Sequence, residues 1–213
     1  ADRALQLARG TLYEPAVAAF RDYYLGLMER GRARYVEPLA YLLASFNPEL
    51  VSRRAESPLV IDGVLDEAAW KSALPVTLAN TVNGKATLEP TEVRTCHDAD
   101  HFYFAVGAAD PAVKTRPRQR GAPGTVDGIA IYLDVSQSRR SYYRIAVDLT
   151  GIVHDFHHVG QKDSGPPDWH SQAVAAVAIA DGRYEVEVAV PRASLAAPSG
   201  DLSTAEWGVL VGR

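Results

Sequence analysis

The 213-residue sequence contains one cysteine and one methionine, and it lacks any long hydrophobic run. A single cysteine, Cys96, excludes a disulfide framework and a zinc site built on cysteines. No apolar stretch reaches the roughly 20 residues that a membrane-spanning helix needs. The first ten residues also lack the apolar segment of a signal peptide. We therefore expect no membrane span, and we interpret the chain as a fragment or a mature portion of a longer protein.

The sequence also has no excess of positive charge, because its formal net charge is -4. The only basic run, "KTRPRQR" at residues 114–120, is explained more simply by a solvated loop than by a phosphate-binding surface. Nucleic acid is therefore not an expected partner. The length is sufficient for a hydrophobic core that needs no covalent staple.

The first fifty residues show the spacing of helices. Two stripes of apolar residues recur every three or four positions, and this spacing predicts two or three helices. The stripes are Val17, Phe20, Tyr24, Leu27 and Met28, and then Leu39, Leu42, Leu43 and Phe46. We assign residues 1–52 to a short α-helical region, either a linker or the remnant of a preceding catalytic domain.

After Ser57 the pattern changes to alternation in steps of two, which is typical of strands. The clearest strands are "HFYFAVGAAD" (101–110), "GIAIYLDV" (128–135), "YYRIAVDL" (142–149) and "RYEVEVAV" (183–190). No long helical segment separates them, which favours an antiparallel arrangement. We predict a mainly β fold, an antiparallel β-sandwich of the jelly-roll or immunoglobulin-like kind, over residues 57–213.

Alternation also assigns side chains to faces. The inward set is Ile129, Ile131, Leu133, Tyr143, Ile145, Val147, Tyr184, Val186, Val188 and Val190, and the outward set is Tyr132, Asp134, Tyr142, Arg144, Asp148, Glu185 and Glu187. Glu185 and Glu187 project the same way and do not flank a cleft, as the two carboxylates of a glycosidase must. We interpret them as ordinary charges on a solvated face, so we favour a non-catalytic role and leave the question of an enzyme open.

Six motifs occur in a characteristic order: "VIDGVLDEAAW" (60–70), "TEVRTCHDADHFYFAVGAADP" (91–111), "DGIAIYLDV" (127–135), "YYRIAVDLTG" (142–151), "DWHSQAVAAVAIADGRYEVEVAVPRASL" (168–195) and "EWGVLVGR" (206–213). Together they resemble the family 9 carbohydrate-binding modules over roughly residues 58–213. The resemblance implies a β-sandwich that binds ends of oligo- or polysaccharides by aromatic stacking and polar contacts, often with structural calcium. It also implies attachment to a larger glycosidase and a secreted or periplasmic location.

The helical region has a looser resemblance of its own. "LYEPAVAAFRDYYLGLMERG" (12–31) is similar to the helix that follows the catalytic barrel in some bacterial glycoside-hydrolase-like proteins. This similarity implies that the parent catalytic domain is a partner of the module.

Aromatic residues near planar polar groups are the signature of sugar binding, because an apolar pyranose face lies on a ring while its hydroxyls meet polar side chains. Trp169 lies in the proline-rich "GPPDWH", where a large ring can stay exposed. Tyr142, Arg144 and Tyr132 share the outward sheet face. We predict that these four residues bind carbohydrate, and we assign Trp70 and Trp207 to the core.

Calcium requires several hard oxygen ligands from acidic loops. Our candidate ligands are Asp62, Asp66, Asp127 and Asp134. The competing interpretation of the first two is structural: Asp62 and Gly63 form a tight turn, and Asp66 caps a short helix. Four histidines crowd one region, His154, His157, His158 and His170. Solvated loop or strand-end histidines explain this cluster better than a transition-metal site.

Three hypotheses therefore compete. The first is a non-catalytic carbohydrate-binding domain. The second is a structural domain that packs on its parent catalytic domain without binding sugar, and burial of both Trp169 and Tyr142 would favour it. The third is a haem-binding electron-transfer relative, for which the only methionine is Met28, outside the predicted sandwich.

Overall fold

The computed structural model describes residues 49–80, 86–114, 127–137, 141–159, 169–195 and 206–213, together with residues 9, 17 and 18. The predicted helical region, with Met28 and the motif at 12–31, lies almost entirely outside the described residues. By its contacts the chain divides into two compact units, one of residues 1–49 and 80–87, the other of residues 50–79 and 88–213. The domain boundary expected between residues 52 and 57 stays a prediction.

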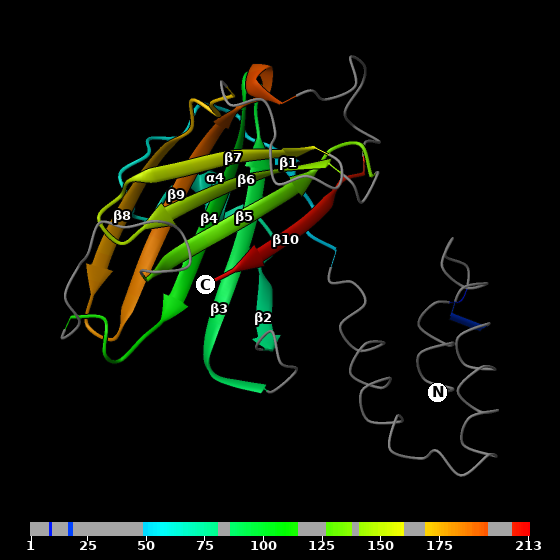
Figure 1. Cartoon of the computed structure of the whole chain (residues 1–213). Coiled ribbons are helices and arrows are strands. Elements are labelled where there is room, and N and C mark those ends of the chain that lie inside the picture. The colour runs from blue at the N-terminus through cyan, green and yellow to red at the C-terminus, as the bar shows by residue number, and fades with distance from the viewer. Residues whose placement is uncertain are drawn as a thin grey trace, which may run out of the picture. The chain divides into compact units, whose positions relative to one another are not determined.

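The second unit is built mostly of strands (Figure 1). The elements are β1 (Arg53–Arg54), α4 (Ala68–Ser72), β2 (Val76–Asn80), β3 (Ala86–His97), β4 (His101–Ala109), β5 (Gly128–Asp134), β6 (Ser141–Asp148), β7 (Val153–Val159), β8 (Val174–Ala180), β9 (Arg183–Pro191), the 3-10 turn η2 (Arg192–Ser194) and β10 (Gly208–Gly212). No helix among these described elements is long and apolar enough to cross a membrane.

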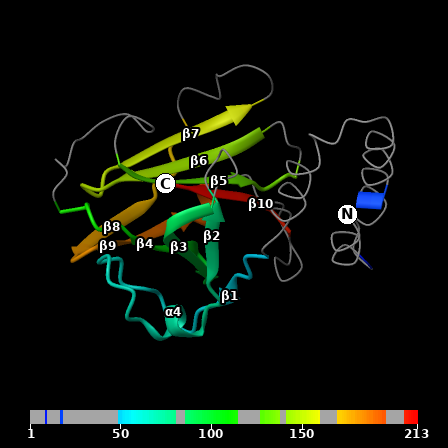
Figure 2. The same cartoon turned by 90° about the horizontal axis from the view of Figure 1, so that it is seen from below.

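Two sheets form the layers of a sandwich. One has the order β1-β3-β4-β9-β8, with β2 also paired to β3, and the other has the order β10-β5-β6-β7. The registered pairs are antiparallel except for the parallel pair of β1 and β3. Figure 2 shows the two layers stacked, with α4 on the side of the larger sheet that faces away from the smaller one. The predicted mainly β sandwich is confirmed.

The main core lies between the sheets, and the predicted inward faces are correct. Ile131, Leu133, Ile145, Val186, Val188 and Val190 are completely buried there. Each such side chain contributes about 1.5–3 kcal/mol by leaving water. Trp207, predicted to be core, is half-buried and packs against this cluster with its ring 4.4 Å from that of Phe102.

A second, smaller core covers the outer side of the larger sheet. It consists of Ala55, Trp70, Ala73, Cys96, Tyr103, Ala105 and Ala189. We call residues 61–73, which include α4, the covering segment. Trp70 is 2% exposed, so its assignment to the core is confirmed.

Glu187 corrects the sequence-based interpretation, because it faces outward as predicted but is completely buried. Its Oε1 accepts a hydrogen bond from the Trp70 indole N–H at 2.7 Å. Its Oε2 accepts from the backbone N–H groups of Asp62 at 3.0 Å and Gly63 at 2.8 Å. The prediction of a solvated charge was wrong because the covering segment folds over this part of the sheet. Burial raises the pKa of the Glu187 carboxyl, although its three hydrogen-bond donors act in the opposite direction.

The turn that opens the covering segment is confirmed. Asp62 Oδ1 accepts the backbone N–H of Val64 at 2.9 Å, and Gly63 has a φ of 89°. The predicted helix cap is wrong, because Glu67 is the N-cap residue of α4 and makes no side-chain capping bond. Asp66 therefore lies one residue outside the position that caps this short helix.

Candidate functional site

One row of side chains crosses all four strands of the smaller sheet on its outer face. Tyr132 lies opposite Leu210 of β10 on one side and opposite Arg144 of β6 on the other, and Arg144 lies opposite Phe156 of β7. Cross-strand neighbours of this kind approach within about 5 Å, so their side chains form one continuous surface.

A second row runs beside the first. Tyr142 lies opposite His158, and their rings stack with centroids 4.7 Å apart and an interplanar angle of 15°. The Tyr142 ring also lies 5.8 Å from that of Tyr132 in the first row. We call Tyr132, Tyr142, Arg144, Phe156, His158 and Leu210 the aromatic platform.

Arg144 places a permanent positive charge within this surface. Its guanidinium carbon lies 5.7 Å from the centre of the Tyr132 ring, a cation–π geometry. Its Nε is withdrawn from solvent and has no hydrogen-bond partner. Within the described residues Arg144 also has no ion pair.

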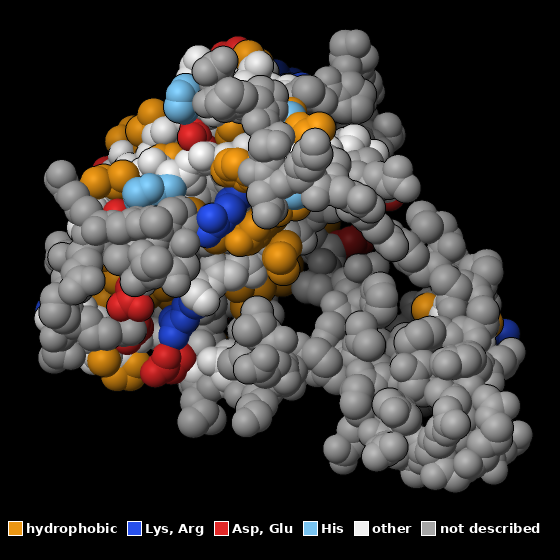
Figure 3. All heavy atoms as spheres, viewed as in Figure 1, with side chains coloured by type: hydrophobic (Ala, Val, Ile, Leu, Met, Phe, Trp, Pro, Cys, Tyr) orange, Lys and Arg blue, Asp and Glu red, His pale blue; other side chains and the backbone are white. Residues whose placement is uncertain are grey.

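The platform is accessible from solvent. Leu210 is 63% exposed and Phe156 is 38% exposed, and the other members are half-buried. Figure 3 faces this sheet and shows hydrophobic side chains beside a basic group, with histidines near them. Such a surface offers rings for stacking and planar donors for hydroxyl or carboxylate oxygens.

Three of the four residues predicted to bind carbohydrate are therefore brought together. Tyr132, Tyr142 and Arg144 share the face that alternation assigned to them, while their role in binding stays a prediction. Sequence reasoning missed Phe156 and Leu210 as members of this surface. The signal was present in "VHDFHHV", whose alternate residues share one face, but the pairing of β7 and β10 with their neighbours could not be read from the sequence.

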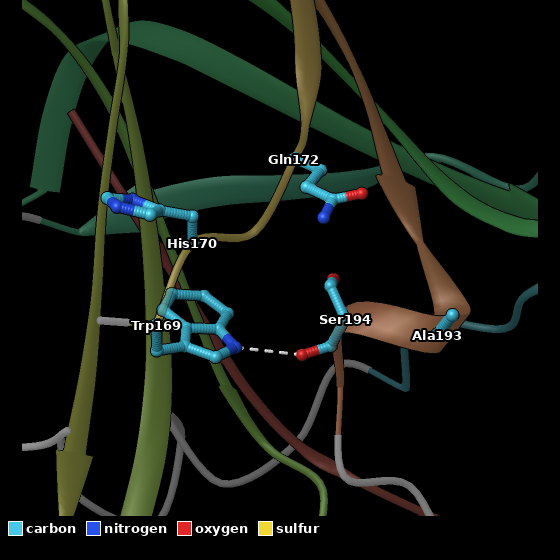
Figure 4. A pocket seen from close by; sticks show the side chains of 5 residues that line it. All are labelled: Trp169, His170, Gln172, Ala193 and Ser194. Carbon is cyan, nitrogen blue, oxygen red and sulfur yellow. Dashed lines mark hydrogen bonds between the residues drawn. The ribbon is translucent and has the colours of Figure 1, made fainter.

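The structure does not bring Trp169 to the platform. Its indole N–H donates to the carbonyl oxygen of Ser194 at 2.8 Å, and its ring lies 4.9 Å from that of Tyr143, a residue of the inner face. The half-buried ring lines a hollow of about 350 Å³ with His170, Gln172, Ala193 and Ser194 (Figure 4). This hollow is a second candidate site, separate from the platform.

The clustered histidines lie mostly on a strand, β7, and each has a different environment. His157 is half-buried against the rings of Tyr143 and Trp169, and burial lowers its pKa, as does the neighbouring His158. The solvated-histidine interpretation is wrong for His157. It suits His170, whose side chain is 75% exposed and lies 3.5 Å from Asp155. Nowhere in the described ranges do three metal-binding side chains gather.

The four candidate calcium ligands do not converge. Asp127 and Asp134 flank opposite ends of β5, roughly 20 Å apart at about 3.3 Å per residue. Asp62 belongs to the turn over the larger sheet, and Asp134 Oδ1 accepts the N–H and hydroxyl of Ser136. These residues do not fit a shared calcium site.

Asp148 is a further correction on this sheet. Alternation assigned it to the outward set, yet it is only 3% exposed. Its Oδ1 accepts hydrogen bonds from the N–H and hydroxyl of Thr150 and from the N–H of Ile152. The turn between β6 and β7 therefore folds around this carboxylate.

Comparison with known proteins agrees with this architecture. The family model described as "Carbohydrate family 9 binding domain-like" matches residues 61–205. A family 9 carbohydrate-binding module from Caldicellulosiruptor kristjanssonii, solved with glucose, is similar over 76% of each chain, with a TM-score of 0.53 and 16% identity. A structure of a family 9 module from the same organism with cellotriose is similar over 67% of each chain, with a TM-score of 0.47 and 16% identity. No curated protein matches the sequence. The chain belongs to the family 9-like carbohydrate-binding domains.

Proposed function

We propose that this domain binds saccharides without catalysis and that the aromatic platform is its binding surface. The observation that carries the proposal is the unbroken group of Tyr132, Tyr142, Arg144 and Phe156 across three neighbouring strands of the smaller sheet. Family membership over residues 61–205 supports the general function, and a module of similar fold was solved with glucose.

The chemistry of the platform suits a pyranose ring. The C–H groups on one face of the sugar pack against Tyr142 or Phe156, where contact with an aromatic ring replaces water. The hydroxyl groups at the sugar's edge then meet the Arg144 guanidinium and the tyrosine hydroxyls. Neither step requires a reacting group, and the buried Glu187 lies on the other sheet.

Calorimetric titration with glucose, cellotriose and xylotriose tests the proposal. We expect binding by the wild type and about tenfold weaker binding by Tyr142→Ala, since a stacking ring contributes about 1 kcal/mol beyond its buried area. Val174→Ala is the matched control, because Val174 is 59% exposed on β8 of the other sheet. Failure of every sugar to bind would contradict the general function.

The hollow beside Trp169 gives the alternative location for the sugar. If the saccharide binds there, His170→Ala should weaken binding and Tyr142→Ala should leave it unchanged. The platform predicts the opposite pattern, so the two variants decide between the sites. NMR chemical-shift changes during the titration provide an independent location.

Calcium, a parent glycoside-hydrolase-like protein and export from the cytoplasm remain parts of the proposal that rest on the family resemblance. Repeating the titrations with excess calcium and with EDTA tests the first. An unchanged affinity and an unchanged melting temperature would remove calcium from the proposal.

The two rival hypotheses have no specific support from the described residues. Burial of both Trp169 and Tyr142 would have favoured the structural-domain hypothesis, but both are half-buried. The haem hypothesis depended on Met28, which lies outside the described residues. Absence of a Soret band after haem addition would count against it.

A further inference from the structure

The charge of Arg144 bears on which sugars the platform would select, and this inference rests on the proposed function. Four other arginines of the sandwich have acceptors. Arg94 and Arg183 each pair with a glutamate on their own strand, and Arg213 pairs with Glu89. Arg192 donates to the carbonyl oxygens of Asp98 and Ala99. Arg144 differs from these four: within the described residues its guanidinium has no carboxylate or carbonyl acceptor, and its one charge-related contact is the cation–π contact with the Tyr132 ring.

Two acidic side chains assigned to the outer face of this sheet, Asp134 and Asp148, have other partners. Asp134 Oδ1 accepts the N–H and hydroxyl of Ser136. Asp148 is buried by the turn at Thr150 and Ile152, and its Oδ2 lies 3.4 Å from His154 Nε2. Among the described residues, no carboxylate of the protein neutralises the guanidinium.

A guanidinium in this setting favours an anionic ligand. Its planar donors match the two oxygens of a carboxylate, and hydrogen bonds between charged groups are stronger than those to neutral hydroxyls. The flanking rings of Tyr132 and Phe156 reduce the water around the charge, which strengthens its attraction for an anion. The net charge of -4 opposes any anion at long range, so the preference must come from this local contact.

We infer that the platform binds polysaccharides that contain uronic acid units, with the sugar carboxylate on Arg144 and the pyranose ring on the neighbouring aromatic side chains. A uronic acid supplies the planar anion and the stacking face in one residue of the polymer. Neutral glucans supply only the stacking face and the hydroxyl groups.

The test compares cellotriose with the β-1,4-linked triglucuronate, two trisaccharides that differ only at C6 of each sugar. Both are titrated into the full chain at pH 8, where histidine is ordinarily neutral. We expect the triglucuronate to bind at least about tenfold more tightly at low salt, with the difference shrinking as salt screens the charge. Arg144→Gln should abolish the difference, because it should weaken the triglucuronate much more than cellotriose, which loses only hydrogen bonds to neutral hydroxyls.

Two further variants make the result specific. Arg144→Lys keeps the charge but loses the planar fork, so we expect it to retain only part of the preference. Tyr142→Ala should weaken both trisaccharides to a similar extent. Because Arg144 lies on the outer face, all three variants should keep the thermal unfolding transition of the wild type.

Each outcome has a distinct meaning. Equal binding of the two trisaccharides, or tighter binding of cellotriose, would overturn the uronate inference and leave the proposed function standing. A uronate preference that survives in Arg144→Gln would also overturn it. Binding of neither these trisaccharides nor the neutral sugars would instead refute the proposed function.

Discussion

The two outer faces of the sandwich show how the same strand pattern can lead to opposite environments. Glu187 and Arg144 both occupy outward positions on central strands. Glu187 is sealed beneath the covering segment and accepts three hydrogen bonds. Arg144 lies on a surface whose neighbours Phe156 and Leu210 remain exposed. Alternation assigns a side chain to a face, but the rest of the chain decides whether that face is covered.

From the contrast between the two outer faces, we expect the largest loss of stability when Glu187 is replaced. Replacing Glu187 with alanine should lower the free energy of unfolding by about 3 kcal/mol or more, because three N–H donors lose their acceptor and two of these hydrogen bonds are buried. Urea denaturation measures the change. Glu185→Ala is the matched control, because this glutamate lies two residues away on the same strand and pairs with Arg183 near solvent. Its replacement should cost less than about 1 kcal/mol.

Gly63 provides the next largest test of how closely the covering segment lies on the sheet. A Cβ at Gly63 would come within 2.7 Å of Ala178 N and 2.8 Å of Val177 C. Gly63→Ala should therefore destabilise the fold by about 2–4 kcal/mol, combining a backbone clash with an unfavourable φ.

Gly151 serves as a control that separates the cost of the backbone clash at Gly63 from the cost of its positive φ. Its φ of 85° is close to that of Gly63, yet no atom lies within 4 Å of its expected Cβ. Gly151→Ala should cost only about 1 kcal/mol by the same denaturation assay. Equal losses for the two variants would contradict the close contact at Gly63.

The turn between β6 and β7, which folds around Asp148, leads us to expect a pH-dependent change of intermediate size in the free energy of unfolding. Burial by itself would raise the pKa of Asp148, but the hydrogen bonds from Thr150 and Ile152, with a smaller effect from His154, hold that pKa below its usual value. A carboxyl whose pKa is lower in the folded protein than in the unfolded chain stabilises the fold when it is ionised in both states, which holds above the ordinary aspartate pKa of about 4. This contribution to the free energy of unfolding is lost as the pH falls through the lower, folded-state pKa.

Asp148→Asn measures this contribution. The variant should be about 1–2 kcal/mol less stable at pH 7, and the gap should narrow as the pH falls toward 2.5. Urea denaturation across this range gives the comparison. A gap that stays constant with pH would show that the charge of Asp148 does not contribute to stability.

The smallest change in stability is expected on the platform itself. Phe156→Ser should alter the free energy of unfolding by less than about 1 kcal/mol, because the Phe156 ring is already partly solvated in the folded protein. The same variant should weaken saccharide binding. A large loss of stability would show that this face is part of the core, and the contrast between the two outer faces would fail.

The sequence was sufficient for the sheet interior and for much of the candidate site. Period-two alternation correctly placed Ile131, Ile145 and Val188 in the core, because one buried face fixes the register of a strand. It also placed Tyr132, Tyr142 and Arg144 on one face. These features depend on neighbours in sequence or on adjacent strands, and both leave a local pattern.

The errors share a different physical origin. The burial of Glu187 depends on Trp70, which is 117 residues away in the chain, and no local pattern records that contact. Trp169 stood in a proline-rich motif that is typical of exposed loops, yet its ring packs beside Tyr143. The gathering of Leu210 and Phe156 with Tyr132 similarly required strand pairing over long separations.

The lone cysteine of the smaller core gains a practical property from its position. Cys96 is sealed beside Trp70, and burial, with a smaller effect from nearby carboxylates, raises its pKa to about 12. At neutral pH the sulfur is therefore almost entirely protonated and unreactive toward alkylating reagents. Modification of Cys96 in an otherwise native sample therefore requires the covering segment, residues 61–73, to open locally. The rate of thiol labelling then measures how often this local opening occurs.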